Sequence, residues 1–343
     1  AINEELARRQ EGYGRGGRMT IEKDKAEILS GVRGKRSIGG PIALMVPNKD
    51  FKINELPVVK KPRPGHADLV GVMKYGQEDV RDVLERASAR ETTARVAVGA
   101  VCKAFLKEFG VEITSHVVGI GGVWADTSNL DFDKIRKESK DSPMHCADKE
   151  ATKKMMARVD EARTSKDTIG GVFEVIVRGV PVGLGSFVHY DRRLSAQLCA
   201  ALMSIQAVKG VEIGMGFKVA ESLGKQVHDE IFHEKGKGFH RKTNRAGGFE
   251  GGVTNGENLV LRAATKPYAT LMSPLQSVHI GSKEKDVATV ERSDVTAVPA
   301  CGVVGESMVA FELAKSFLEK FGGDSLKETK RNYSGYLDQL KEF

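Results

Sequence analysis

Apolar residues spaced three or four positions apart predict six helices along the chain. These helices cover residues 2–10, 78–109, 149–163, 194–208, 304–321 and 325–341. Three of the segments are followed by glycine, at Gly110, Gly210 and Gly322. A glycine just past a helix is a frequent stop signal, because it adopts the left-handed conformation without a steric penalty.

Runs of β-branched and alternating apolar residues predict the strands. They fall near residues 27–32, 41–46, 111–118, 171–180, 182–190, 211–219 and 258–264. Strands and helices alternate irregularly, without the cadence of roughly 30 residues that is typical of a doubly wound parallel sheet. Neither an internal repeat nor a linker is visible. The pattern therefore predicts an α+β fold and a single domain over residues 1–343.

Composition and charge narrow the class of partner. The chain has 53 basic and 46 acidic residues, a net charge of +7, which suits nucleic acid, an anionic membrane or a small phosphorylated molecule. Aromatic residues make up only 6%, which argues against nucleic acid. No run approaches the length of a membrane span. Basic residues concentrate in the Gly- or Pro-rich segments 8–36 and 60–63, which favours a pocket for a compact anion.

Three common site types fit the sequence poorly. The four cysteines form no CxxC pair, so we expect that the protein has no structural zinc site. We also expect that it works in a reducing compartment, the cytoplasm. His228 and His233 are five positions apart, whereas a helical metal pair needs a spacing of four. The pattern Gly12-x-Gly14-x-x-Gly17 follows a predicted helix, whereas a dinucleotide fingerprint follows a strand.

The segment Pro62-Arg63-Pro64-Gly65-His66-Ala67-Asp68 carries the strongest chemical signal. Two prolines and a glycine restrict the backbone around one imidazole, with an arginine and an aspartate close by. A rigid loop of this kind can present a group that titrates near neutral pH for acid–base chemistry. A purely structural histidine remains the alternative.

Three further segments are candidates for ligand contacts, because they combine small or extended stretches of backbone with charged side chains. Residues 85–92 alternate small residues with arginine, and residues 247–256 contain the glycines of a loop that passes close to a flat or anionic group. Arg292 and Asp294 lie two apart on an extended segment, so we expect them to face the same side.

Taken in order, these segments resemble the chorismate synthase family. The resemblance rests on residues 8–19, 63–68, 85–92, 204–210, 247–256, 266–270 and 291–294, and covers nearly the whole chain. It implies a β-α-β sandwich, with long helices between two antiparallel sheets, that assembles as a homotetramer. It also implies a lyase that converts 5-enolpyruvylshikimate 3-phosphate to chorismate and phosphate by an anti-1,4-elimination, with reduced FMN as cofactor. An FMN-binding protein without lyase activity is the alternative.

The resemblance also implies roles for individual residues. Catalytic positions match His66, Asp294 and Ser88. Positions for FMN match Arg86, Ala87, Ser88, Gln206, Ala207, Gly251, Lys266, Pro267, Tyr268, Ala269, Thr270 and Arg292, and positions for NADP match Arg9 and Arg15. The substrate has one phosphate and two carboxylates, for which the candidate cations are Arg15, Arg18, Arg63, Arg90 and Arg292. NADPH or a separate flavin reductase would supply the reducing equivalents.

The chain departs from the family pattern at its start and in one loop. The family's first strand carries Gly-Glu-Ser-His-Gly, whose histidine protonates the departing phosphate, and this motif is absent here. Residues 31–35 look one residue short, and the loop between residues 51 and 62 is shorter than usual. Because residues 1–6 have the pattern of a helix interior, we expect roughly thirty to forty further residues ahead of Ala1.

Overall fold

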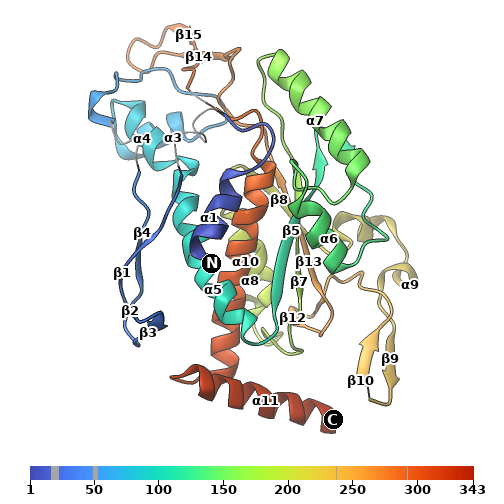
Figure 1. Cartoon of the computed structure of the whole chain (residues 1–343). Coiled ribbons are helices and arrows are strands. Elements are labelled where there is room, and N and C mark those ends of the chain that lie inside the picture. The colour runs from blue at the N-terminus through green and yellow to red at the C-terminus, as the bar shows by residue number, and fades with distance from the viewer. Residues whose placement is uncertain (17–22, 49–52, 237, 292) are drawn as a thin grey trace.

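The computed structural model describes residues 1–16, 23–48, 53–236, 238–291 and 293–343. Its largest sheet has five antiparallel strands in the order β6-β5-β7-β13-β8 (Figure 1). The strands are β5 (Glu112–Ile120), β6 (Val123–Trp124), β7 (Gly171–Arg178), β8 (Val208–Ile213) and β13 (Leu259–Thr265).

Helices cover both faces of this sheet. One face packs against a layer of four helices: α1 (Ile2–Gln10), α5 (Thr92–Lys107), α8 (Leu194–Met203) and α10 (Val298–Phe321). The other face packs against α6 (Phe132–Lys140), with α7 (Lys149–Thr164) beside β5 and β6. The terminal helix α11 (Leu326–Glu342) crosses the far end of α10 (Figure 1).

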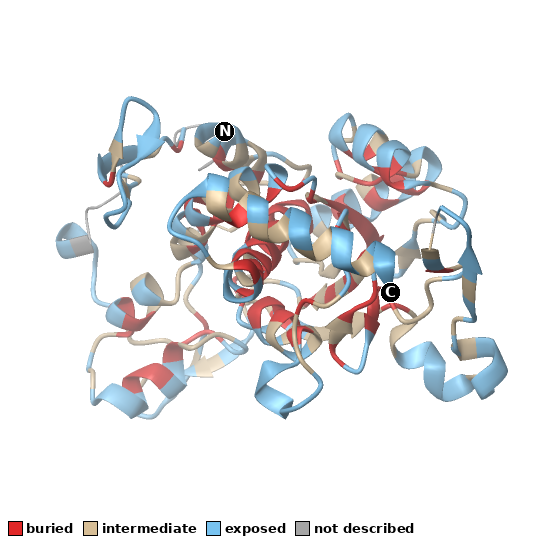
Figure 2. Ribbon diagram, turned by 90° about the horizontal axis from the view of Figure 1, so that it is seen from below, coloured by how far each residue is buried: buried red, intermediate tan, exposed pale blue. Residues whose placement is uncertain are grey.

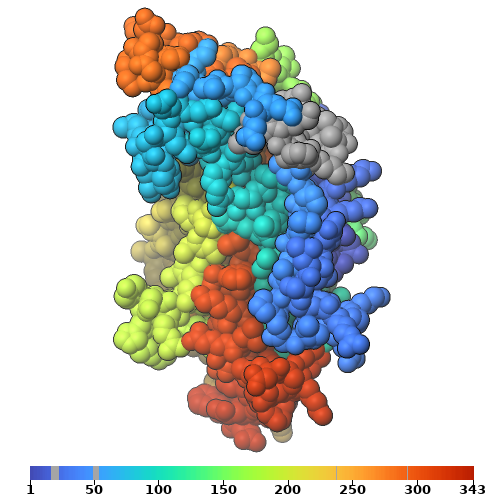
Figure 3. All heavy atoms as spheres, turned by 90° about the vertical axis from the view of Figure 1, so that its left-hand side faces the viewer, coloured from blue at the N-terminus to red at the C-terminus, as the bar shows by residue number. Residues whose placement is uncertain are grey.

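A second, two-stranded sheet lies on the outer side of α5. It pairs β1 (Glu27–Ser30) with β4 (Ala43–Met45), and β4 contacts α5. Figure 3 shows this ribbon alongside α5, with α10 and α8 next to it. The α+β prediction, with long helices between antiparallel sheets, is confirmed by this layering.

The remaining elements are short. The hairpins are β2 (Val32–Arg33) with β3 (Arg36–Ser37), β9 (Ile231–Glu234) with β10 (Gly238–Arg241), β11 (Phe249–Glu250) with β12 (Val253–Thr254), and β14 (Gln276–Val278) with β15 (Lys285–Val287). The short helices are α3 (Asp68–Tyr75), α4 (Val80–Arg86), α9 (Gly224–Val227), η1 (Ile53–Glu55), η2 (Ala89–Glu91), η3 (Tyr190–Arg192) and η4 (Gly216–Glu221). No helix in the described ranges is long and apolar enough to cross a membrane.

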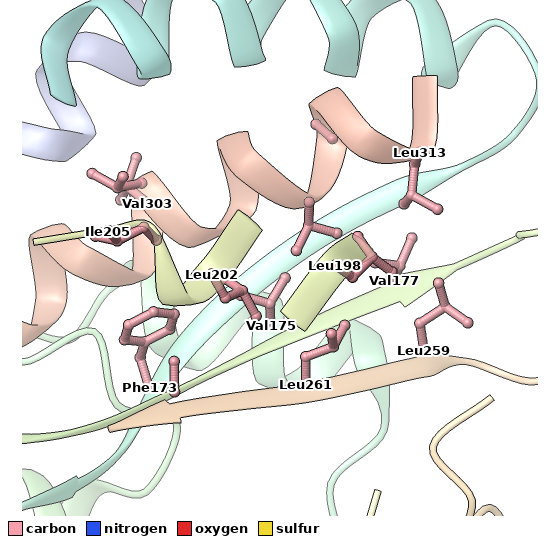
Figure 4. Packing of buried hydrophobic residues seen from close by; sticks show 14 of the residues in the cluster. Phe173, Val175, Val177, Leu198, Leu202, Ile205, Leu259, Leu261, Val303 and Leu313 are labelled. Carbon is pink, nitrogen blue, oxygen red and sulfur yellow. The ribbon is translucent and has the colours of Figure 1, made fainter. Parts of the chain in front are cut away.

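The main core lies between the sheet and the helical layer, where Figure 2 shows the buried residues concentrated. Along β7, Phe173, Val175 and Val177 point into this core, because alternate residues of a strand face the same side. Figure 4 shows these side chains facing α8, from which Leu198 and Leu202 point toward the sheet, with Leu261 of β13 on the neighbouring strand. The alternation therefore decides which residues of β7 face the four-helix layer and which, such as Ile176, face α6.

One close helix crossing depends on glycine. A Cβ placed on Gly99 of α5 would lie 2.3 Å from the Cβ of Ser307 in α10, which no real contact allows. The absence of a side chain lets the two helix backbones approach each other closely.

The structure corrects five of the predicted elements. The helix predicted over 78–109 is broken into α4, η2 and α5, because Ser88 caps η2 by accepting a hydrogen bond from the Arg90 N–H at 3.3 Å. The strand predicted over 182–190 is wrong, since Gly183 and Gly185 have positive φ angles there. The helix α8 ends at Met203, and the following strand begins at Val208 instead of residue 211. The helix α10 begins at Val298, six residues before the predicted start.

A buried carboxylate joins the helical layer to the sheet. Glu306 of α10 is 0% exposed and accepts two hydrogen bonds from the Arg8 guanidinium of α1, at 2.8 and 2.9 Å. Ser115 of β5 donates to it at 2.6 Å, and Lys103 of α5 forms an ion pair with it. Burial raises the pKa of the Glu306 carboxyl, but the two cations outweigh burial and hold that pKa well below its usual range.

Glu306→Gln should lower the free energy of unfolding by about 3 kcal/mol or more, because Arg8 and Lys103 would lose their buried counter-charge. In the wild type this stabilisation is present above the unfolded pKa of 4.5 and is lost as the pH falls below it, because the folded pKa is the lower one. Urea denaturation between pH 7 and pH 3 would measure both effects, and the variant should show the weaker pH dependence. Glu319→Gln is the matched control on the exposed face of α10; it should change stability by about 1 kcal/mol or less. Equal effects of the two substitutions would contradict the assignment.

Candidate functional site

Most of the expected site residues meet at one end of the five-stranded sheet. At this end α5 begins at Thr92, α10 begins at Val298 and β13 ends at Thr265. The loop before α3, the Ser88 break and the segment 293–297 converge here from distant parts of the sequence. We call the group Arg9, Arg15, Arg63, Arg90, Lys209 and Lys266 the cationic site.

The histidine loop is held in place from both sides. Gly65 has a φ of 76°, in the left-handed region that favours glycine, so a residue with a side chain would be strained at this position. The β14–β15 hairpin fixes the loop from outside, because Ser277 Oγ donates to the Pro62 carbonyl at 2.5 Å and the Ile280 N–H donates to the Lys60 carbonyl at 2.9 Å.

Inside the loop, Asp68 binds both neighbouring functional side chains. Its Oδ1 lies 2.5 Å from Nδ1 of His66, and its Oδ2 accepts from Nε of Arg63 at 2.9 Å. Burial raises the pKa of the Asp68 carboxyl, but the hydrogen bonds from His66 and Arg63 lower this pKa by a larger amount. The carboxyl therefore stays ionised. The imidazole itself is 22% exposed and remains accessible to a ligand.

The same contacts occupy Arg63. Its Nη1 donates to Thr270 Oγ1 at 2.7 Å, and its Nη2 donates to Asp68 Oδ1 at 3.1 Å. The residue is 7% exposed. Arg63 therefore joins the histidine loop to the segment 266–270, in addition to contributing positive charge.

Asp294 anchors the glycine loop that follows α1. Its Oδ1 accepts a hydrogen bond from the Gly16 N–H at 2.6 Å, and its Oδ2 forms an ion pair with Nη1 of Arg15 at 3.1 Å. Arg18 and Arg292, both expected to bind the substrate, lie outside the described residues.

Arg9 and Arg90 share one acidic partner, Asp24. Nη1 of Arg9 lies 3.4 Å from Oδ2 of Asp24, and Nη1 of Arg90 lies 2.5 Å from its Oδ1. Arg9 is 6% exposed and also donates to Thr92 Oγ1 at 2.9 Å. Burial lowers the pKa of the Arg9 guanidinium, and the nearby charge of Arg15 lowers it further.

The Gln206–Ala207 turn lies beside Lys266. Ala207 has a positive φ of 68°, and its carbonyl accepts from the Lys266 N–H at 2.9 Å. Gln206 donates through Nε2 to Glu91, while its Oε1 is buried without a hydrogen-bond partner among the described residues. A ligand with an N–H or O–H group would satisfy this acceptor.

Lys266 is a cation of the site whose charged form is disfavoured by its surroundings. Burial lowers the pKa of its ammonium group, and repulsion from Lys209 and Arg63 lowers it further. Arg63 is paired with Asp68, but no ion pair holds Lys266 among the described residues, so a bound anion such as phosphate would supply its counter-charge.

The other expected FMN residues divide into two groups. Ala87 and Ser88 lie at the break before η2, and Arg86 just before them is exposed. Pro267, Tyr268 and Ala269 lie between Lys266 and Thr270. Gly251, however, lies in the β11–β12 turn beside Phe187 and Gly252, near the other end of β13. Within one chain, the structure does not bring Gly251 to the cationic site.

The sequence interpretation missed three members of this arrangement. Asp68 was part of the quoted motif, but its double contact with His66 and Arg63 requires the fold. Lys209 lies two positions after Ala207 in the sequence, so its position near the Gln206–Ala207 turn could have been predicted. Asp24 lies in a segment without any motif, and no sequence signal identifies it.

Comparisons with known proteins point to one family. The sequence profile of the chorismate synthase family matches residues 1–318. Chorismate synthase of Geobacter metallireducens is 54% identical over 365 aligned residues, which cover 100% of this chain and 92% of that protein. The Bacillus cytotoxicus enzyme is 51% identical with the same coverage. A crystal structure of chorismate synthase matches with a TM-score of 0.82 at 43% identity, covering 100% of this chain and 90% of that one.

Lys266→Met should raise the melting temperature of the ligand-free protein, because it removes repulsion among Lys266, Lys209 and Arg63. The same change should reduce the rise in melting temperature that inorganic phosphate produces, since one cation of the anion site is lost. Lys225→Met, on the exposed helix α9, is the control and should alter neither value. A phosphate response equal to that of the wild type would show that Lys266 does not contribute to anion binding.

Proposed function

Because the chain belongs to the chorismate synthase family, we propose that its cationic site binds 5-enolpyruvylshikimate 3-phosphate together with reduced FMN. The reaction breaks the carbon–oxygen bond to phosphate, removes a proton from the substrate ring by anti-1,4-elimination and gives chorismate. The match over the full length of the chain at 54% identity carries this proposal.

The substrate's charges fit the residues of the site. Its phosphate and two carboxylates need several fixed cations, and Arg15, Arg63 and Arg90 gather at one end of the sheet with Lys266. Guanidinium groups that are already hydrogen-bonded to acidic partners are held in fixed orientations. Such preorganised charge lowers the reorganisation needed when the anionic substrate binds.

Several residues fit a bound flavin mononucleotide. The unpartnered Oε1 of Gln206 offers an acceptor, and Lys266 offers a cation for the phosphate group. Ala87, Ser88, Ala207 and the segment 267–270 supply backbone and small side chains around them. When bound, reduced FMN supplies the electron-rich isoalloxazine that facilitates loss of phosphate without net oxidation.

The chain's own residues would manage the protons. We assign His66 the role of holding a proton on its imidazole next to the flavin, where positive charge stabilises an anionic ring. Asp294, whose oxygens accept from Gly16 and Arg15, would tune proton transfer at the same place. Ser88 fixes the position of Arg90 through its Oγ.

We further propose the family's homotetramer as the assembly. Gly251 lies near the opposite end of β13 from Lys266, so a contact between Gly251 and the flavin would come from a second copy of the chain. The loop beside Gly251 exposes Phe187, Val188 and Tyr190, by 72%, 66% and 84%. Exposed apolar side chains of this kind are frequent at subunit contacts.

The proposal also covers the reductant that supplies electrons to FMN and the cellular location of the protein. NADPH is one candidate reductant, with Arg9 and Arg15 as candidate contacts, and a separate flavin reductase is the other. Arg9 already uses its guanidinium on Thr92, Ala89 and Asp24, so an NADPH contact there would replace one of these bonds. A cytoplasmic location agrees with the four free cysteines.

Anaerobic turnover of 5-enolpyruvylshikimate 3-phosphate with chemically reduced FMN tests the function. Oxidised flavin absorbance should first change on mixing with the protein and change further when substrate is added, because the two ligands share one site. Chorismate and phosphate should then form in equal amounts after reduction. Flavin binding without product would favour the alternative of an FMN-binding protein, and no flavin perturbation at tens of micromolar protein would refute the proposal.

His66→Ala should lower kcat by about 10- to 10⁴-fold, the range from electrostatic tuning of the flavin to full acid–base participation. FMN affinity should change much less, since many other groups contact the cofactor. Thermal unfolding of the variant separates loss of function from loss of fold. Full activity, or failure to fold, would support a purely structural histidine.

A further inference from the structure

We infer that Asp68 is a positioning residue that fixes the tautomer of His66, so that Nδ1 keeps its proton and Nε2 alone exchanges a proton during the reaction. The inference rests on the proposed role of His66. It is carried by three observations: the 2.5 Å contact, the burial of Asp68 and the way its remaining hydrogen-bond capacity is used.

The first step is the state of the carboxylate. Asp68 is 1% exposed and receives hydrogen bonds from Arg63 on both oxygens, at 2.9 Å from Nε to Oδ2 and 3.1 Å from Nη2 to Oδ1. The Arg63 backbone N–H adds a third, at 3.0 Å to Oδ2. A carboxylate with this many donors is ionised and can only accept.

The second step follows for the imidazole. Since Oδ1 can only accept, the nitrogen 2.5 Å away, Nδ1, must carry a proton in the neutral ring as well as in the cation. Nε2 is then the position where the ring gains or loses its second proton. Two cations lie near the ring: Arg63 of the same loop, whose Nη2 is 3.1 Å from Nδ1, and Lys266, whose ammonium lies 3.8 Å from where a Cβ on the neighbouring Gly65 would be.

Asp68→Asn tests the idea because an amide has one acceptor instead of two. The Arg63 backbone N–H and Nε both point at the Oδ2 position, so the amide oxygen should occupy it. The NH2 group then faces Nδ1 of His66 and can only donate. This forces the neutral ring to carry its proton on Nε2, the inverse of the wild-type tautomer.

Nitrogen-15 NMR of histidine-labelled protein reads the tautomer directly, with His66→Gln identifying the signals. At a pH where the ring is neutral, we expect a protonated Nδ1 in the wild type and an unprotonated Nδ1 in Asp68→Asn. Turnover of the variant should fall by about 10²- to 10⁴-fold in kcat with little change in KM, because a wrong tautomer removes proton transfer without removing substrate contacts.

Asp82→Asn is the matched control, an exposed aspartate on the neighbouring helix α4, and should leave the tautomer and kcat unchanged. A neutral wild-type ring with its proton on Nε2 would overturn the inference, and so would a folded Asp68→Asn protein with wild-type kcat. The wild-type spectrum decides the first point even if Asp68→Asn does not fold. Should the wild type lack lyase activity, the proposed function fails, while the NMR comparison still decides the tautomer.

Discussion

The buried Glu306 carboxylate constrains how the helical layer sits on the sheet. It accepts from α1, α5 and β5 at once, and its own helix α10 is the most buried in the layer. A buried charge of this kind is tolerated only when its partners are held at hydrogen-bond distance, so the relative positions of four elements are coupled. The close crossing of α5 and α10 at Gly99 depends on the same alignment.

This alignment has a direct consequence for the site. Arg9 follows Arg8 on α1, so the salt bridge that fixes Arg8 to Glu306 also places Arg9 against Thr92 at the start of α5. Asp294 and Val295 lead into the start of α10 and receive the loop that follows α1. The N-terminal loop, the Ser88 break and the 293–297 segment therefore meet because one ionic cluster deeper in the molecule sets the helix positions.

The site balances positive charge in two ways. Arg9, Arg15, Arg63 and Arg90 each have an acidic partner, which fixes their orientation. Lys266 is different, because burial and neighbouring cations disfavour its charged form. The paired arginines form a rigid frame, while the lysine is the group that gains most when an anionic ligand arrives, since the ligand supplies the missing counter-charge.

The sequence by itself determined the elements with strong local periodicity, such as α1, α7, β7 and β13, and the restricted backbone of the segment 62–68 around His66. These follow from side-chain spacing and backbone restriction within a few residues, which is information the chain carries locally. Tertiary structure alone decided that Ser88 would interrupt a helix, that Asp24 would join Arg9 to Arg90, and that Gly251 would lie away from Lys266. Their neighbours are tens to hundreds of residues distant in sequence, and only the packing of helices on the sheet brings such groups together or keeps them apart.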